Sequence, residues 1–204
     1  MIAIVDYGLG NVKAFAYVYS QLNIAFAVAK RAEELAGADR LILPGVGAFD
    51  QAMLRLEEAG MREALDDLVV GRKVPVLGVC VGMQMLGRSS EEGRRPGLGW
   101  LDGEVKRFTP SGSARAMRVP HMGWNGIRPV RESGLLAGLD SEARFYFLHS
   151  YYFKSRRPED VIAVTDYYGG FASAVNFGNI YGVQFHPEKS HQGGIRLLRN
   201  FAGI

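Results

Sequence analysis

Cys80, the only cysteine of the sequence, ends an apolar run and has a glycine two residues away on each side, Gly78 and Gly82. An apolar strand that ends in a sharp, glycine-flanked turn predicts a nucleophile elbow, in which the turn lifts the reactive side chain clear of the sheet edge. A helix that begins just after Cys80 would place its N-terminal dipole near the sulfur and favour the thiolate. A lone cysteine without this context is usually a small buried apolar residue. The context instead predicts a nucleophile.

The run Gln184–Ser190, far downstream, contains His186 and Glu188. Alternation along an extended segment puts these two side chains on one face, because neighbouring residues of a strand point to opposite sides. Glu188 could then hold one ring nitrogen of His186 while the other ring nitrogen meets a thiol. Together with Cys80, the pair predicts a nucleophile, a base and an orienting carboxylate.

Such a nucleophile also needs backbone donors for the oxyanion that forms during attack. The turn Pro44–Gly47 follows a predicted strand and can direct N–H groups toward the thiol, and the N–H of Val81 is the natural second donor. The four histidines show neither CxxC nor HExxH spacing, and a single cysteine excludes a thiolate-rich metal site. We therefore predict no metal site.

The elements that must position these residues alternate between strand and helix in the first half of the chain. Strands are predicted at Ile2–Val5, Ile24–Val28, Leu41–Leu43 and Val74–Val79, and helices at Val12–Gln21, Asp50–Glu58, Met61–Val70 and after Cys80. This alternation predicts an α/β fold, with a parallel sheet that carries helices on both faces. Ligands bind beyond the carboxyl ends of the strands in such sheets. The turns at 6–11, at 44–47 and at Cys80 all follow predicted strands, so they point to one edge.

The second half of the chain has short strand-like segments separated by turn residues, which is typical of antiparallel strands added to the parallel core. They are Gly103–Phe108, Ile127–Val130, Arg144–Leu148, Val161–Thr165, Ala172–Val175 and Ile180–Phe185, and a closing helix is predicted at Gly194–Phe201. No repeat, low-complexity tract or linker interrupts the 204 residues. We therefore predict one domain over residues 1–204.

The composition is that of an ordinary soluble protein, with 48% hydrophobic and 22% charged residues. The net charge of +3 is spread over scattered basic residues, which does not favour a nucleic-acid partner. No apolar run is long enough to span a membrane, and the first residues resemble a strand rather than a signal peptide. A single cysteine forms no internal disulfide, which fits a reducing compartment, so we predict a cytoplasmic protein.

The elbow Gly78–Gln84, together with the His186-Pro-Glu188 run, resembles the class I, or triad, glutamine amidotransferases. Further similarity narrows this to the glutaminase subunits of histidine biosynthesis. It lies in the runs Asp6–Asn11, Pro44–Phe49, Ser90–Gly93, Val119–Asn125, His149–Tyr151 and His186–Ser190. The match is collinear from the first strand to the last helix. It implies a flavodoxin-like class I glutamine amidotransferase fold, in which a mostly parallel central sheet has flanking helices and added antiparallel strands.

The resemblance also implies a reaction and a partner. Glutamine would be hydrolysed to glutamate, without a cofactor. The ammonia would pass to a (βα)₈ cyclase subunit of a heterodimer, which makes imidazole glycerol phosphate and AICAR.

The resemblance assigns roles to individual residues as well. Cys80, His186 and Glu188 match the catalytic triad, and Gly47 and Val81 match the oxyanion site. Positions that hold glutamine in the family are matched by Gln84, Glu92, His149, Ser150 and Tyr151. Positions that face the synthase partner are matched by Asn11, His121, Trp124, Asn125, Tyr146 and Lys189.

Three alternatives stay open. His191 and the run Gly87–Ser90 are closer to paralogues that feed ammonia to amino-sugar synthases for surface polysaccharide. Those paralogues share the triad, so they change the pathway and not the glutaminase chemistry. Intracellular cysteine peptidases and stress proteins with a related elbow usually have a histidine directly after the cysteine, where this chain has Val81. A non-catalytic binding subunit is disfavoured because every triad position is filled.

Overall fold

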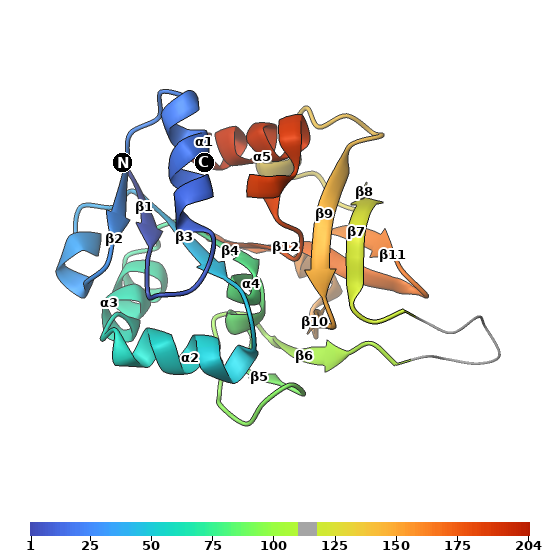
Figure 1. Cartoon of the computed structure of the whole chain (residues 1–204), viewed down its shortest axis with the longest axis horizontal. Helices are drawn as coiled ribbons and strands as arrows, with labels where there is room; N and C mark the ends of the chain where they lie inside the picture. The colour runs from blue at the N-terminus through green and yellow to red at the C-terminus, as the bar shows by residue number, and fades with distance from the viewer. Residues whose placement is uncertain (110–117) are drawn as a thin grey trace.

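The computed structural model describes residues 1–109 and 118–204 (Figure 1). In this part of the chain an eight-stranded sheet runs through the centre of the molecule. Its strands, in spatial order, are β2 (Phe26–Ala29), β1 (Ile2–Val5), β3 (Arg40–Gly45), β4 (Val76–Cys80), β13 (Ile180–Val183), β12 (Gly170–Phe177), β11 (Val161–Asp166) and β8 (Arg128–Pro129). The strands from β2 to β13 are parallel, and the remaining three are antiparallel to their neighbours. This confirms the α/β class and the mostly parallel sheet.

Helices cover both faces of the sheet (Figure 1). On one face lie α1 (Val12–Gln21) and α5 (His191–Gly203), and on the other lie α2 (Phe49–Glu58), α3 (Arg62–Asp66) and α4 (Val81–Met85). Each long helix buries one apolar stripe, as Phe15 does in α1 and Leu198 and Phe201 do in α5. Because the central strands are covered on both sides, their residues read as continuous apolar runs. The helices packed on the two faces hold the central strands, and therefore their carboxyl ends, in place.

Two smaller sheets pack beside the main one. One has the order β10 (Tyr151–Ser155), β6 (Gly103–Arg107) and β5 (Ser89–Ser90), and the other pairs β7 (His121–Gly126) with β9 (Arg144–His149). The sequence did not predict β7 or β10. The β7 sequence contains two glycines and an asparagine, residues with poor strand propensity, and its pairing with β9 overrides that local preference.

Short helical turns complete the chain. They are η1 (Ala32–Leu35), the π-helical η2 (Asp67–Gly71), η3 (Gly134–Leu136), η4 (Pro158–Asp160) and η5 (Pro187–Lys189). The predicted helix over 61–70 is therefore shorter, because α3 ends at Asp66 and passes into η2. The closing helix is longer than predicted and begins at His191.

Three strand predictions need correction. β13 pairs in parallel with β4 as well as antiparallel with β12, so it belongs to the parallel core and not only to the antiparallel addition. β2 begins at Phe26, because the N–H of Ile24 still bonds the Tyr19 carbonyl at the end of α1. The segment predicted at 127–130 contributes only β8, an edge strand in which Pro129 lacks an N–H to donate.

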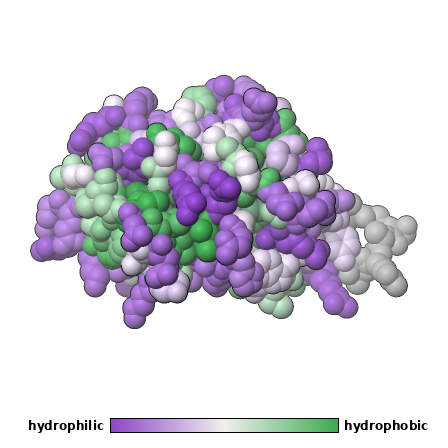
Figure 2. Space-filling model, turned by 90° about the horizontal axis from the view of Figure 1, so that it is seen from above, coloured by the Kyte–Doolittle hydropathy of each residue, from purple (hydrophilic) through white to green (hydrophobic). Residues whose placement is uncertain are grey.

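Hydrophobic side chains form one continuous core between the sheet and its helices. On the face drawn in Figure 2, hydrophilic residues cover much of the surface, with hydrophobic ones in patches between them. Among residues 1–109 and 118–204, no helix is both long and apolar enough to cross a membrane.

Candidate active site

The turn between β4 and α4 holds Cys80 at the carboxyl edge of the sheet. Cys80 has φ +56° and ψ −112°, a backbone conformation that is strained for a residue with a side chain. The backbones around it are too close for any side chain at two positions. A Cβ at Gly82 would lie 2.0 Å from the Leu43 carbonyl oxygen, and one at Gly78 would lie 2.7 Å from the Gly82 carbonyl oxygen. Close packing of α4 against β3 and β4 therefore forces the sharp turn expected of a nucleophile elbow.

His186 and Glu188 meet at the end of β13. The Nδ1 atom of His186 lies 2.9 Å from Oε1 of Glu188, and both side chains are almost fully buried. His186 itself is extended, but the extended segment predicted to continue to Glu188 is wrong, because Pro187 begins the 3₁₀ turn η5, which contains Glu188. The backbone N–H of His186 donates to the Tyr146 carbonyl, which connects this turn to β9.

The pKa of His186 depends on its two neighbours, Cys80 and Glu188. Burial lowers its pKa, but hydrogen bonding to Cys80 and Glu188 and the charges of both groups outweigh burial and raise the pKa to about 10. The imidazolium is therefore the favoured state near neutral pH. A buried imidazolium between a sulfur and a carboxylate is suited to protonate a leaving group.

A cavity of about 340 Å³ opens at this edge. The predicted site residues in its wall are Gly47, Cys80, Val81, Gln84, Glu92, His149, Ser150, Tyr151, His186 and Lys189. Glu188 does not line the cavity and contacts His186 instead. Val46, Pro120 and Leu148 also line it; Val46 belongs to the predicted turn 44–47, whereas the chemistry of Pro120 and Leu148 does not mark them in the sequence.

The cavity walls are braced by hydrogen bonds from distant segments. Oε2 of Glu92 accepts from the N–H of Phe49 at 2.9 Å, which ties the acidic run to the start of α2. Gly47 has φ +84°, a conformation that favours glycine, and no atom outside its chain neighbours lies within 4 Å of its Cβ position. In the neighbouring strand pair, Gly45 of β3 is in register with Cys80 of β4. The turn 44–47 therefore lies beside the thiol.

His149 lines the cavity, and its ring is held by hydrogen bonds within the protein. Its Nδ1 atom is 2.8 Å from the Tyr151 carbonyl oxygen, and its Nε2 atom is 3.1 Å from Nδ1 of His121. Both ring nitrogens are thus engaged within the protein. His149 shapes the cavity wall, and its nitrogens are not free for a ligand.

Gln184 has a part in the site that the sequence did not reveal. Its side chain is completely buried, and its Nε2 atom lies 3.8 Å from the Cys80 sulfur. The sulfur also lies 3.9 Å from the Leu148 carbonyl oxygen. A glutamine at the end of an apolar strand is the only signal that the sequence offers for this contact.

Several residues expected to face a partner form an exposed surface next to the cavity. Trp124 is 41% exposed and stacks on the ring of His191 at 4.9 Å between centroids. Tyr146 packs edge-on against Trp124, and Nζ of Lys189 lies 5.8 Å from the Tyr146 ring. We define Trp124, Tyr146, Lys189 and His191 as the aromatic rim.

The other expected partner residues differ in exposure. Asn125 is half-buried on β7, and Asn11 is half-buried at the N-cap of α1, where its side chain makes no capping hydrogen bond. His121 is a correction: it is only 3% exposed, because its ring is stacked between Phe147 and Tyr167. His121 therefore has no face to present to a partner.

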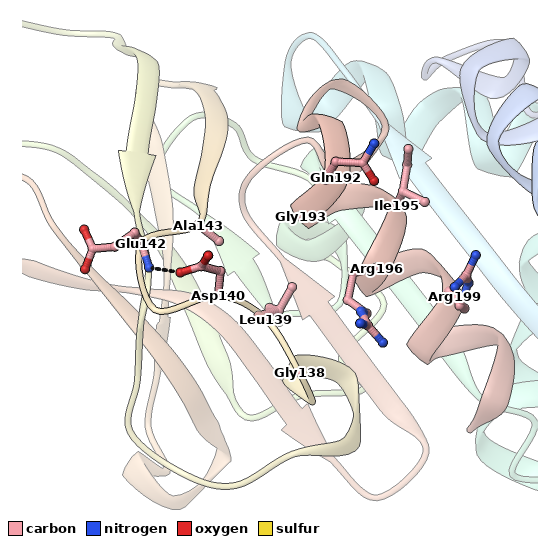
Figure 3. Close-up of a pocket in the computed structure, with 10 residues that line it drawn as sticks. All are labelled: Gly138, Leu139, Asp140, Glu142, Ala143, Gln192, Gly193, Ile195, Arg196 and Arg199. Atoms are coloured by element: carbon pink, nitrogen blue, oxygen red, sulfur yellow. Dashed lines mark hydrogen bonds between the residues drawn. The ribbon is translucent and has the colours of Figure 1, made fainter.

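A larger cavity, of about 470 Å³, lies between α5 and the loop before β9, and it contains none of the predicted site residues (Figure 3). Arg196 and Arg199 extend from α5, and the Asp140 side chain accepts from the Glu142 N–H across the loop. The described part of the chain contains no group of three or more His, Cys, Asp or Glu side chains that could hold a metal ion. The smaller cavity above Cys80 is thus the place where the predicted nucleophile, the predicted base and polar walls come together.

Comparison with known proteins gives this arrangement a context. The family model for glutamine amidotransferase class-I matches residues 3–203. A curated relative from Bdellovibrio bacteriovorus, named imidazole glycerol phosphate synthase subunit HisH, is 57% identical over 204 residues that cover both chains completely. A relative of the same name from Leptospira interrogans is 52% identical, again over the whole of both chains.

The fold also matches solved structures. The structure of PurLQS from Thermotoga maritima superposes with a TM-score of 0.73 at 18% identity, covering 99% of this chain and 97% of the other. At that identity the similarity concerns the fold alone.

Proposed function

This chain belongs to the class I glutamine amidotransferase family, and on that premise we propose that it is the glutaminase subunit of an imidazole glycerol phosphate synthase in histidine biosynthesis. The full-length identity of 57% and 52% to two subunits of that name supports this pathway over the amino-sugar paralogues. The observation that carries the chemistry is the strained Cys80 turn in one cavity wall with His186, which is backed by Glu188.

In the proposed mechanism, the Cys80 thiolate attacks the side-chain amide carbon of glutamine. The N–H groups of Val81 and Gly47 would stabilise the oxyanion, which is commonly the largest single contribution to such catalysis. His186, held as imidazolium by Glu188, protonates the departing ammonia and leaves a thioester on Cys80. The neutral imidazole then takes a proton from a water molecule that attacks the thioester, which releases glutamate and restores the Cys80 thiolate and the His186 imidazolium.

Glutamine recognition is proposed for the remaining cavity residues. Glu92, Ser150 and the backbone of Tyr151 line the cavity and offer polar groups for the charged end of the substrate. Gln84 and His149 support them from behind, because both donate to the Tyr151 carbonyl. The whole chain, residues 1–204, is proposed to act as a single domain.

The synthase implies a second protein chain, and we propose that this partner is a (βα)₈ cyclase in the cytoplasm. The aromatic rim, with Asn11 and Asn125, is the surface proposed to contact it, since it borders the cavity where ammonia forms. Ammonia would then reach the cyclase without entering bulk solvent.

The test compares wild type with Cys80→Ala in the assembled synthase. Glutamate release is measured for the isolated glutaminase chain, and then with the cyclase and its ribonucleotide. We expect wild type to hydrolyse glutamine fastest in the complete mixture. We expect Cys80→Ala to lose glutamine-dependent turnover and to keep turnover fed by ammonium salt. Loss of both activities in a folded complex would contradict the proposed division of labour.

A further inference from the structure

Two buried imidazoles lie outside the catalytic triad, and their hydrogen bonds have a fixed direction. A carbonyl oxygen only accepts, so Nδ1 of His149 carries the proton in its 2.8 Å contact with the Tyr151 carbonyl. Burial lowers the pKa of His149 to about 3, which leaves the ring neutral and Nε2 as an acceptor. Nδ1 of His121, 3.1 Å away, must therefore be the donor to that atom.

The outer end of this arrangement is anchored on β7. Burial lowers the pKa of His121 to about 4, so its Nε2 atom accepts from Nδ2 of Asn125 at 3.4 Å. The Asn125 amide has its own fixed orientation, because Nδ2 also donates to the Asp166 carbonyl and Oδ1 accepts from the Gly126 N–H. Asn125 thus presents its NH₂ group to Nε2 of His121.

The inner end reaches the nucleophile. The Tyr151 carbonyl accepts a second hydrogen bond, from Nε2 of Gln84 at 2.9 Å. The same Nε2 atom donates to Oε1 of Gln184 at 3.1 Å, and both glutamine side chains are buried. With its oxygen held by Gln84, Gln184 must turn its NH₂ group toward the Cys80 sulfur, 3.8 Å away.

We propose that Gln184 is a positioning residue for Cys80 and that it directs one N–H at the sulfur. The Tyr151 carbonyl orients Gln84, and Gln84 orients Gln184. The hydrogen bonds from Asn125 through His121 to His149 hold that carbonyl in place. The proposal rests on the function proposed above. A donor aimed at the sulfur stabilises the thiolate and restricts its position. A reversed Gln184 amide would face the sulfur with an acceptor and would lose the bond from Gln84.

This series of hydrogen bonds connects β7 with the Cys80 sulfur. Asn125 lies on β7 next to Trp124 of the aromatic rim, and Gln184 contacts the reacting sulfur. Every connection between them is a directional hydrogen bond inside the protein. A change in the position of β7 would therefore reach the nucleophile through the position of the Tyr151 carbonyl, which accepts from both His149 and Gln84.

The test measures alkylation of the Cys80 thiol by iodoacetamide as a function of pH, which requires no glutamine turnover. Gln184→Leu removes the donor at similar volume, and His121→Phe keeps the stacked ring but removes its N–H. Ser173→Ala is the matched control, since Ser173 is fully buried beside Gln184 and its hydroxyl has no hydrogen-bond partner among the described residues. The other titratable groups around the thiol are unchanged in all three variants; they are His186, His149, Tyr7, Tyr151, Glu92 and Lys189.

We expect Gln184→Leu to move the midpoint of alkylation up by about one pH unit, the size of one hydrogen bond to a charged group. His121→Phe should give a smaller upward shift, and Ser173→Ala none. In the glutaminase assay, Gln184→Leu should lower kcat and leave KM close to that of wild type. Should the leucine variant not fold, Gln184→Met, which is unbranched like glutamine, replaces it.

Two results would overturn the proposal. An unchanged midpoint in folded Gln184→Leu would mean that the amide does not act on the sulfur. A shift in Gln184→Leu with none in His121→Phe would mean that the hydrogen bonds from β7 do not hold the Tyr151 carbonyl that orients Gln84 and Gln184. A wild-type thiol that is alkylated normally in a protein without glutaminase activity would contradict the proposed function instead, so the two failures are distinct.

Discussion

Replacing Glu188 with glutamine should destabilise the His186 imidazolium of the proposed mechanism. The carboxylate oxygen lies 2.9 Å from Nδ1 of His186, and water has almost no access to either side chain. A hydrogen bond to a charged group contributes about 1.5–3 kcal/mol. Since one pH unit corresponds to about 1.4 kcal/mol, Glu188→Gln should lower the pKa of His186 by roughly one to two units. The same free energy, if lost from the transition state, lowers kcat by about ten- to hundredfold.

The pKa of His186 can be measured without interference from the thiolate. Cys80→Ala and the double variant Cys80→Ala/Glu188→Gln are labelled with ¹⁵N in the imidazole and titrated by NMR, so that the difference between them isolates Glu188. The kinetic arm uses Glu188→Gln alone, with glutamate release as the readout. Glu63→Gln on α3 is the matched control, because this exposed carboxylate undergoes the same chemical change far from the site.

Equal titration midpoints in the two NMR variants would refute the reasoning, since Glu188 would then contribute nothing to the charge of His186. A normal kcat in Glu188→Gln would show that the imidazolium needs no carboxylate for turnover.

Three further predictions concern stability and assembly. Because the folded-state pKa of His186 is raised from 6.5 to about 10, its stabilising contribution is complete below about pH 6.5 and is lost as the pH rises through 10. Between about pH 6.5 and about pH 9.5, the free energy of unfolding in urea should therefore decrease more in wild type than in Glu188→Gln. Equal decreases in the two proteins would contradict this assignment. Phe185→Ala should lower the free energy of unfolding by about 3–5 kcal/mol, since the ring is fully buried and packs 4.3 Å from that of Phe145; a loss below about 1 kcal/mol in urea unfolding would argue against this packing. Trp124→Ala should weaken binding to the cyclase by about 2 kcal/mol, measured by titration calorimetry. The control is Tyr17→Ala, at an exposed position on α1, which should leave the affinity unchanged. Equal affinity for both variants would show that the aromatic rim is not part of the interface.

The parallel core could be predicted from the sequence because its strands and helices carry strong local signals. The apolar runs at Ile2–Val5 and before Cys80, and the apolar stripe of α1, each specify one element. β7 escaped prediction because two glycines and an asparagine favour turns, and only pairing with β9 makes the segment a strand. The direction of β13 depends on β4, a neighbour about one hundred residues away in the chain, which local patterns do not encode.

The site divides in the same way. Cys80, His186 and Glu188 could be predicted because their residue types and spacing are typical of a nucleophile, a base and a carboxylate, and the structure brings them together. Gln184 and the burial of His121 were not found. Their positions depend on which side chains meet across different sheets, and a polar residue in an apolar run has no sequence signal for its partner.

The close contact of α4 with β3 divides the glycines near Cys80 into those that a second mutation could rescue and those that none could. An added methyl group at Gly182 would meet mainly side-chain atoms, the nearest being Cγ of Met83 at 2.7 Å, so trimming Met83 could make room. At Gly82 the obstacle is the Leu43 carbonyl oxygen, which every amino acid at position 43 would retain. Natural and engineered variants thus face the same restriction. Side chains around the elbow can be varied in combination, whereas the close backbone contact at position 82 accepts only glycine.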